Sequence, residues 1–229
     1  MNVDVIMLAN TTDITKYGMT CRAINTLDWS DDTFDFNITI VESNKKHLEQ
    51  GFVYHTKTIV PDDKFGYNKY LNHGLNSIQN LSEWVIITNN DVIFTLNWFT
   101  NLMNVSEQRP DILSFSPWEP NWHKKRGMTP DKLINEGYRT SFEITGWCLV
   151  MHRDVIYDCK LFDPAFEFWY QDNDYALTLQ KHNIKHALIS NSRVYHMVSG
   201  SHDTLPNENK HHMTDGQVNV LYNKWGTNV

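Results

Sequence analysis

Apolar residues in this chain form short continuous runs, and segments with helical spacing separate most of them. The apolar runs cover residues 3–8, 36–41, 57–60, 84–88 and 112–116. Runs of this length with little polar alternation predict strands that are buried on both faces of a sheet. Helices are predicted over residues 14–27, 67–78, 96–105, 153–159, 175–182 and 207–225.

Strands and helices that alternate in this order predict an α/β fold with three layers. A mainly parallel central sheet of Rossmann-like topology carries helices on both faces. Ligands of such sheets bind beyond the carboxyl ends of the strands, and Asn10, Glu42, Gly66 and Asp91 are expected there. Residues 1–95 are therefore expected to form a nucleotide-binding half. The chain lacks the Gly-x-Gly-x-x-Gly pattern of dinucleotide-binding folds.

The interval from residue 117 to residue 139 has a different composition from its surroundings. It contains three prolines, the tryptophans Trp118 and Trp122, and the basic run Lys124-Lys125-Arg126. Long loops in compact domains usually have a function, so we expect a lid or an acceptor-facing flap. An apolar strand with Gly146 near its middle is predicted over residues 141–152, as where a ligand approaches the backbone.

A carboxylate pair and a histidine follow in the stretch from residue 166 to residue 202. Asp172 and Asp174 precede the helix predicted at 175–182, and His196 follows the next predicted strand. Because one helix and one strand separate the carboxylate pair from His196, the two groups can lie at the same edge of a sheet. Such an arrangement suits a metal-assisted reaction with a general base beside the metal. Asp174 is expected to cap the helix, and Asn183 to end it in the left-handed conformation.

Composition limits the class of protein. The chain has 229 residues, of which 41% are hydrophobic and 13% aromatic, values typical of a globular protein. Its net charge of −7 argues against a protein whose main task is to bind a phosphate backbone. No apolar segment approaches the roughly 20 residues of a membrane span, and no signal peptide is recognised at the start. The three scattered cysteines favour buried thiols in a reducing compartment, so we expect a soluble, cytoplasmic protein.

Several segments, in order, resemble the family-two inverting nucleotide-sugar glycosyltransferases of the GT-A fold. They are the loop after the first strand; Glu42; Phe65–Gly74; Asn89-Asn90-Asp91; Thr145–Leu149; Leu161–Phe166; Gln171–Asp174; and Tyr195-His196 with Ser199-Gly200-Ser201. Two positions depart from the family pattern. Its Asp-x-Asp is reduced to Asn89-Asn90-Asp91, and the Glu that precedes its catalytic Asp is Gln171. Both changes remove negative charge, which bears on how tightly a metal is held.

The resemblance implies a metal-dependent inverting transferase that uses Mn²⁺ or Mg²⁺ and a UDP-linked or other nucleotide-sugar donor. Asp91 and His196 would bind the metal, and Asp172 would be the general base, with Asp174 as the alternative base if the two roles are exchanged. Donor-binding residues implied by the resemblance are Ala9, Asn10, Thr11, Glu42, Gly66, Asn68, Asn72, Asn90, Gly146 and Trp147. Structural alternatives remain open for Asn68 and Asn72 (an exposed helix face), for Trp147 (a core residue) and for His196 (a hydrogen-bonded core residue). The chain is interpreted as one domain, 1–229, in which 96–229 form the acceptor-binding and catalytic half with a C-terminal helix.

Other functions stay open at this point. The composition also resembles phage-encoded transferases, so one alternative is a DNA glycosyltransferase that acts on a hydroxymethylated base in the host cytoplasm, although the acidity counts against it. A second is a nucleotide-sugar or carbohydrate-binding module without catalysis. A sugar-1-phosphate nucleotidyltransferase would need a Gly-rich, basic loop after the first strand, and Ala9-Asn10-Thr11-Thr12 is not one. The acceptor is expected among glycans, lipid-linked sugars and modified DNA.

Overall fold

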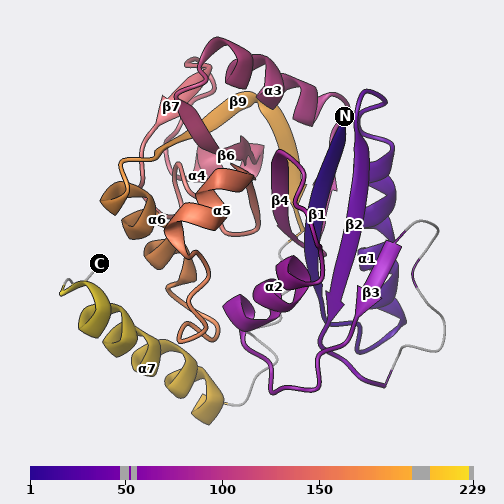
Figure 1. The fold of residues 1–229 in the computed structure, drawn as a ribbon, viewed down its shortest axis with the longest axis vertical. Coiled ribbons are helices and arrows are strands. Elements are labelled where there is room, and N and C mark those ends of the chain that lie inside the picture. The colour runs from indigo at the N-terminus through magenta and orange to yellow at the C-terminus, as the bar shows by residue number, and fades with distance from the viewer. Residues whose placement is uncertain (47–51, 53–55, 198–206, 227–229) are drawn as a thin grey trace.

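The structure, a computed structural model, describes residues 1–46, 52, 56–197 and 207–226 (Figure 1). Its elements in chain order are β1 (Asn2–Ala9), α1 (Ile14–Asp28), β2 (Asp35–Glu42), β3 (Thr56–Ile59), α2 (Tyr67–Asn76), β4 (Trp84–Asn89), β5 (Val92–Phe94), α3 (Trp98–Gln108), β6 (Ile112–Trp118), α4 (Pro120–Lys125), β7 (Ile134–Glu136), β8 (Cys148–His152), α5 (Arg153–Cys159), α6 (Gln171–Lys181), β9 (Lys185–His196) and α7 (Asn207–Trp225).

The strands form a sheet in the order β3-β2-β1-β4-β8-β6-β9-β5, and β7 pairs with β9. Parallel pairing joins β3, β2, β1 and β4, and it also joins β6 to β9. Strand β8 is antiparallel to both β4 and β6, so β6 and β9 run in the same direction as β1 to β4. The sheet is therefore mainly parallel, with β5, β7 and β8 reversed. This confirms the predicted α/β architecture.

Two apolar clusters cover the two faces of the sheet. Alternate residues of β1 enter different clusters: Val5 and Met7 join one, and Ile6 and Leu8 join the other. The first cluster includes apolar residues of α1 and α3, and the second includes those of α2, α5 and α6. Successive side chains of a strand point to opposite faces, so helices cover both faces, as the ribbon also shows (Figure 1). The predicted three-layer arrangement is confirmed.

Most predicted elements are present, with two corrections in the second half. Residues 117–139 are not an unstructured loop, because they contain α4 and β7. The strand predicted over 141–152 is confined to Cys148–His152, since Ser141 has a left-handed φ of 67° that breaks an extended strand. Strand β5 was not predicted because three residues are too few to show a pattern.

The helix ends show which residues act as caps. Asp13 caps α1, accepting from the backbone N–H groups of Thr15 and Lys16 at 2.9 and 3.0 Å. The predicted cap at Asp174 is wrong, because α6 already begins at Gln171 and Asp174 lies inside its first turn. Asn183 has the expected left-handed φ of 55°.

The three cysteines are free; Cys148 and Cys159 are buried as expected, whereas Cys21 is partly exposed. Among the described residues, none of the helices combines the length and apolarity needed to cross a membrane.

Candidate active site at the carboxyl edge of the sheet

Strand register places several predicted site residues side by side. Ala9 pairs with Glu42, and Leu8 pairs with Asn89, so β1, β2 and β4 end at one edge. Strand β8 runs the other way and therefore starts at this edge, where the N–H of Asn89 donates to the carbonyl of Trp147 at 2.9 Å. The first half of the chain and the segment before β8 meet at this edge.

Glu42 organises the loop that follows β1. Its fully buried carboxylate accepts hydrogen bonds from the N–H of Thr11 at 3.1 Å, from the Thr11 hydroxyl at 2.7 Å and from the N–H of Asn44 at 2.6 Å. A buried carboxylate requires such donors to offset the loss of water. The structure thus assigns Glu42 a role in fixing the Ala9–Thr11 loop, and its contact with a donor stays a prediction.

Asp91 and His196, which the family resemblance implies as metal ligands, lie next to each other, and their metal role stays a prediction. Asp91 Oδ1 is 3.2 Å from His196 Nε2, and both side chains are largely buried. The pairing of β5 with β9 creates this contact, and the N–H of Met197 donates to the Asp91 carbonyl at 2.9 Å. Trp147 stacks on the His196 ring at a centroid distance of 4.9 Å. Trp147 is only 7% exposed and joins the core, so it combines a core position with contact to the candidate metal site.

Tyr67, which the sequence did not mark as a site residue, lies close to both Asp91 and Asp172. Its hydroxyl lies 3.1 Å from both Asn89 Oδ1 and the Gly146 carbonyl, so its single proton is shared between two acceptors. Burial raises the pKa of Tyr67, and the nearby charges of Asp172 and Asp91 raise it further. Tyr67 therefore keeps its proton and links the end of β4 to the segment beside Asp172. The signal available in the sequence was its position directly after Gly66, at the start of a predicted helix.

Asp172 lies in a tight slot against Gly146. A Cβ atom at residue 146 would come within 2.2 Å of Asp172 Oδ1, so only glycine leaves room for the carboxylate. Burial raises the pKa of Asp172 to about 6, and the N–H of Gly146 offsets part of that rise. A small cavity of about 10 Å³ adjoins the carboxylate and is lined also by Tyr67, Asn68 and Gln171. A carboxylate with a pKa near neutrality is suited to general-base chemistry.

The slot gives a direct prediction for Gly146→Ala. The added methyl group should displace the Asp172 carboxylate, and a misplacement of about 1 Å costs on the order of 100-fold in rate. Turnover should fall by that amount while the protein remains folded, measured by enzyme kinetics and thermal unfolding. Gly18→Ala on α1 is the matched control, because a Cβ atom added there would meet no other atom within 4 Å. Equal activity of the Gly146→Ala variant and the control would contradict the role of the slot.

Three of the predicted donor-binding asparagines hold elements together. Asn68 and Asn72 on α2 donate their amides to the carbonyls of Asp163 and Phe162, at 3.0 and 2.8 Å. Asn68 is 1% exposed, so the alternative of an exposed helix face is wrong for it. The Asn90 amide donates to the Thr20 hydroxyl at 2.7 Å. Contact of these residues with a nucleotide stays a prediction.

Asp174 has partners that separate it from the reaction. The residue is 3% exposed, and its Oδ1 lies 2.8 Å from both Trp225 Nε1 and Lys224 Nζ of α7. Both groups donate to this carboxylate, which explains why Asp174 faces α7 rather than the helix start. Asp172 is the carboxylate of the pair that faces Gly146, and it is therefore the better candidate base.

The segment from residue 117 to residue 139, which carries the basic run, contacts the candidate site through aromatic rings. The Arg126 guanidinium lies 3.4 Å from the ring centroid of Trp122, and Trp122 meets Trp147 edge to face at 5.0 Å. Trp122 is held by donation from its Nε1 to the Ser141 carbonyl at 3.0 Å. Trp122 thus connects the basic run with the ring that stacks on His196.

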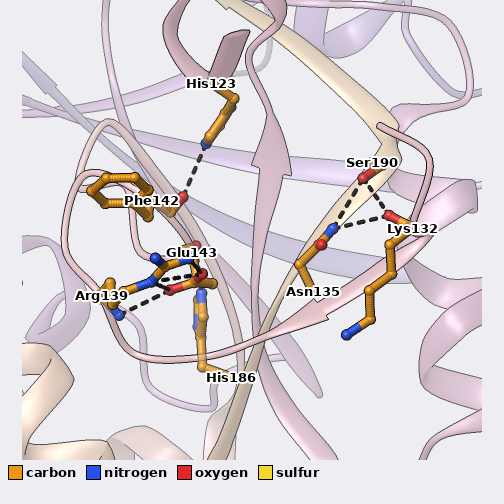
Figure 2. A network of polar contacts seen from close by, with 8 residues as sticks. All are labelled: His123, Lys132, Asn135, Arg139, Phe142, Glu143, His186 and Ser190. Carbon is orange, nitrogen blue, oxygen red and sulfur yellow. Dashed lines mark hydrogen bonds and ion pairs between the residues drawn. The ribbon is translucent and has the colours of Figure 1, made fainter. Parts of the chain in front are cut away.

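Figure 2 shows how this interval is anchored to the fold. His123 bonds to the Phe142 carbonyl at 3.0 Å, and the Arg139 guanidinium pairs with Glu143. His186 is fully buried between the Ser114 hydroxyl at 2.6 Å and the Glu143 carbonyl at 2.9 Å. Burial lowers the pKa of His186 to about 4, so this imidazole is neutral and structural.

The order of the strands and the helices on both faces of the sheet match a GT-A-like fold of the Rossmann type. The structure is similar to the crystal structure of GalNAc-T7 with UDP, GalNAc and Mn²⁺, with a TM-score of 0.65 and 13% sequence identity. The similarity covers 86% of this chain and 44% of that chain, so this chain corresponds to less than half of the matched protein. The sequence matches no protein-family model and no curated protein.

Proposed function

We propose that this protein is a metal-dependent inverting glycosyltransferase that moves a sugar from a UDP-linked or related nucleotide donor to an acceptor hydroxyl. One observation carries the proposal. Asp172 and the Asp91–His196 pair both lie near Tyr67, at the carboxyl edge of a GT-A-like sheet. The matched structure has the same fold and contains UDP and Mn²⁺, which supports the donor and metal.

The residues around Asp91 fit a divalent ion in part. Within the described ranges no group of three or more His, Cys, Asp or Glu side chains gathers, so Asp91 and His196 are a pair. Carboxylate oxygen and imidazole nitrogen are ligands that Mn²⁺ accepts, and His196 Nδ1 is buried without a hydrogen-bond partner among the described residues. The remaining ligand positions would fall to diphosphate oxygens and water. Such an ion, when bound, neutralises charge on the departing diphosphate.

The acceptor side of the reaction falls to Asp172. The acceptor oxygen attacks the anomeric carbon, the bond from that carbon to the diphosphate oxygen breaks, and Asp172 takes the acceptor proton. One displacement of this kind inverts the anomeric configuration. The Tyr67 hydroxyl shares its proton between Asn89 and Gly146, and so holds the leaving-group side and the base side at a fixed separation.

The pH dependence of turnover follows from the state of Asp172. A general base must be ionised, and burial raises the pKa of this carboxyl to about 6. The acidic limb of kcat/KM is therefore expected near pH 6, with activity present above it and lost below it. An acidic limb near pH 4, the range of an exposed carboxylate, would argue against Asp172 as the group that limits the rate.

A panel of nucleotide sugars tests the proposal. Each is incubated with the protein, Mn²⁺ and, in separate reactions, a glycan, a glycolipid or a hydroxymethylated-DNA acceptor, and release of the nucleoside diphosphate is measured. We expect release from at least one UDP-linked donor. Release only with the DNA acceptor would select the DNA glycosyltransferase alternative. Donor binding without release under any condition would select the non-catalytic module.

A further inference from the structure

Helix α7 packs against the segment that carries the candidate base. The helix lies beside α6 (Figure 1). Leu221 of α7 is fully buried and Gln217 is 8% exposed, so this side of the helix belongs to the interior. Polar contacts accompany this apolar contact. They involve residues just before and just after Asp172 in the sequence.

Hydrogen bonds fix the segment from residue 163 to residue 174 to α7. Trp225 Nε1 and Lys224 Nζ each donate to Asp174 at 2.8 Å, and Lys224 also reaches Asp163 at 2.8 Å. Gln217 Oε1 accepts from the N–H of Glu167 at 2.8 Å. Hydrogen bonds that involve an ionised group are stronger than those between neutral groups, so the contacts of Lys224 and Trp225 hold this segment firmly against α7.

The same segment is held on its other side by α2. The N–H of Tyr67 donates to the Glu167 carbonyl at 2.6 Å, next to the bonds from Asn68 and Asn72. Two non-glycine residues in or beside it have left-handed backbones: Phe162, with a φ of 63°, and Tyr170, with a φ of 62°. Strained conformations persist only where the surroundings impose them. Here, the hydrogen bonds to α2 and α7 hold Phe162 and Tyr170 in their left-handed conformations.

We propose that Lys224 and Trp225 are positioning residues, which hold Asp172 in its slot through their bonds to Asp174. This inference rests on the proposed function, in which Asp172 is the base. Asp172 and Asp174 share the first turn of α6, so a shift of that turn away from α7 moves both carboxylates. The slot at Gly146 tolerates little movement, because the carboxylate already fills the space of a methyl group.

The test uses variants that remove a hydrogen bond and keep the shape of the side chain. Trp225→Phe removes the indole N–H and keeps an aromatic ring, and Lys224→Met removes the ammonium and keeps the aliphatic chain. We expect kcat to fall about tenfold in each, as for a base displaced by less than about 1 Å, while KM for the donor changes less than about twofold. Tyr222→Ala on the same helix is the control, because Tyr222 is 51% exposed.

A pH profile separates positioning from a loss of stability. Lys224→Met removes the cation that pairs with Asp163 and Asp174, and Asp174 lies in the same helical turn as Asp172. The titratable group beside Asp172 on its other side is Tyr67. The added repulsion should move the acidic limb of kcat to higher pH, while Trp225→Phe, which retains Lys224, should move it less. Lower thermal stability with unchanged kcat and an unchanged acidic limb would overturn the inference. A wild-type protein without turnover would instead refute the proposed function, and the inference with it.

Discussion

Replacement of Asp172 by Asn is expected to abolish sugar transfer while the affinity for the donor stays nearly unchanged. The amide fills the slot against Gly146 as the carboxylate does, but it cannot take the acceptor proton. Loss of a general base typically costs between about 10²- and 10⁴-fold in rate. Steady-state release of the nucleoside diphosphate gives kcat, and calorimetric titration of UDP gives the donor affinity.

The control for this variant is Asp154→Asn. Asp154 occupies the first turn of α5 as Asp172 occupies the first turn of α6, but its side chain is 59% exposed. The Asp154→Asn variant should transfer sugar at the wild-type rate. Wild-type turnover by Asp172→Asn would show that another group accepts the proton, and the assignment of the base would then be wrong.

Removal of the divalent metal is expected to stop donor turnover, and Asp91→Asn should have nearly the same effect. The departing diphosphate needs compensation of its charge, and metal ions supply several kcal/mol of such stabilisation. A rate loss of about 1,000-fold follows from about 4 kcal/mol. The measurement is diphosphate release after treatment with a chelator and again after Mn²⁺ is restored.

His196→Gln offers a graded comparison with Asp91→Asn. Glutamine retains polar atoms at the end of β9 but lacks the imidazole nitrogen that Mn²⁺ accepts more readily than Mg²⁺ does. Its turnover should be partly restored by raised metal concentration, with a reduced preference for Mn²⁺. Indifference of the wild-type protein to chelation would contradict the metal role of both residues.

Much of the fold was predictable because local patterns determine it. Apolar runs such as residues 3–8 and 84–88 are buried on both faces, so they mark central strands without any knowledge of their neighbours. Parallel strands place their carboxyl ends at one edge, which brought Glu42 and Asn89 beside β1 as the register shows. The same argument places Asp91 and His196 at this edge, but their direct contact depends on the antiparallel pairing of β5 with β9, and β5 was not predicted.

Contacts between distant segments were not predictable from the sequence. The slot for Asp172 depends on β8 running antiparallel to β4, which brings Gly146 to the carboxyl edge. Asp174 was predicted to be a helix cap from its local sequence alone. Its actual partners, Lys224 and Trp225, lie about 50 residues away in sequence, so the local pattern gave no sign of them. Tyr67 gave only a weak signal, its position directly after Gly66, because a tyrosine at the start of a helix is ordinary until its hydroxyl is seen beside Asn89 and Gly146.

The central claim is that Asp91 serves metal and UDP binding whereas Asp172 serves only as the base. Calorimetric titration of UDP into three proteins tests this claim most directly. The wild-type protein, Asp91→Asn and Asp172→Asn are each titrated with Mn²⁺ and again with a chelator. We predict Mn²⁺-dependent binding of one UDP to the wild-type protein and to Asp172→Asn, and its loss in Asp91→Asn. UDP binding of equal affinity with Mn²⁺ and with a chelator would contradict the proposed site. So would UDP binding that persists in Asp91→Asn but is lost in Asp172→Asn.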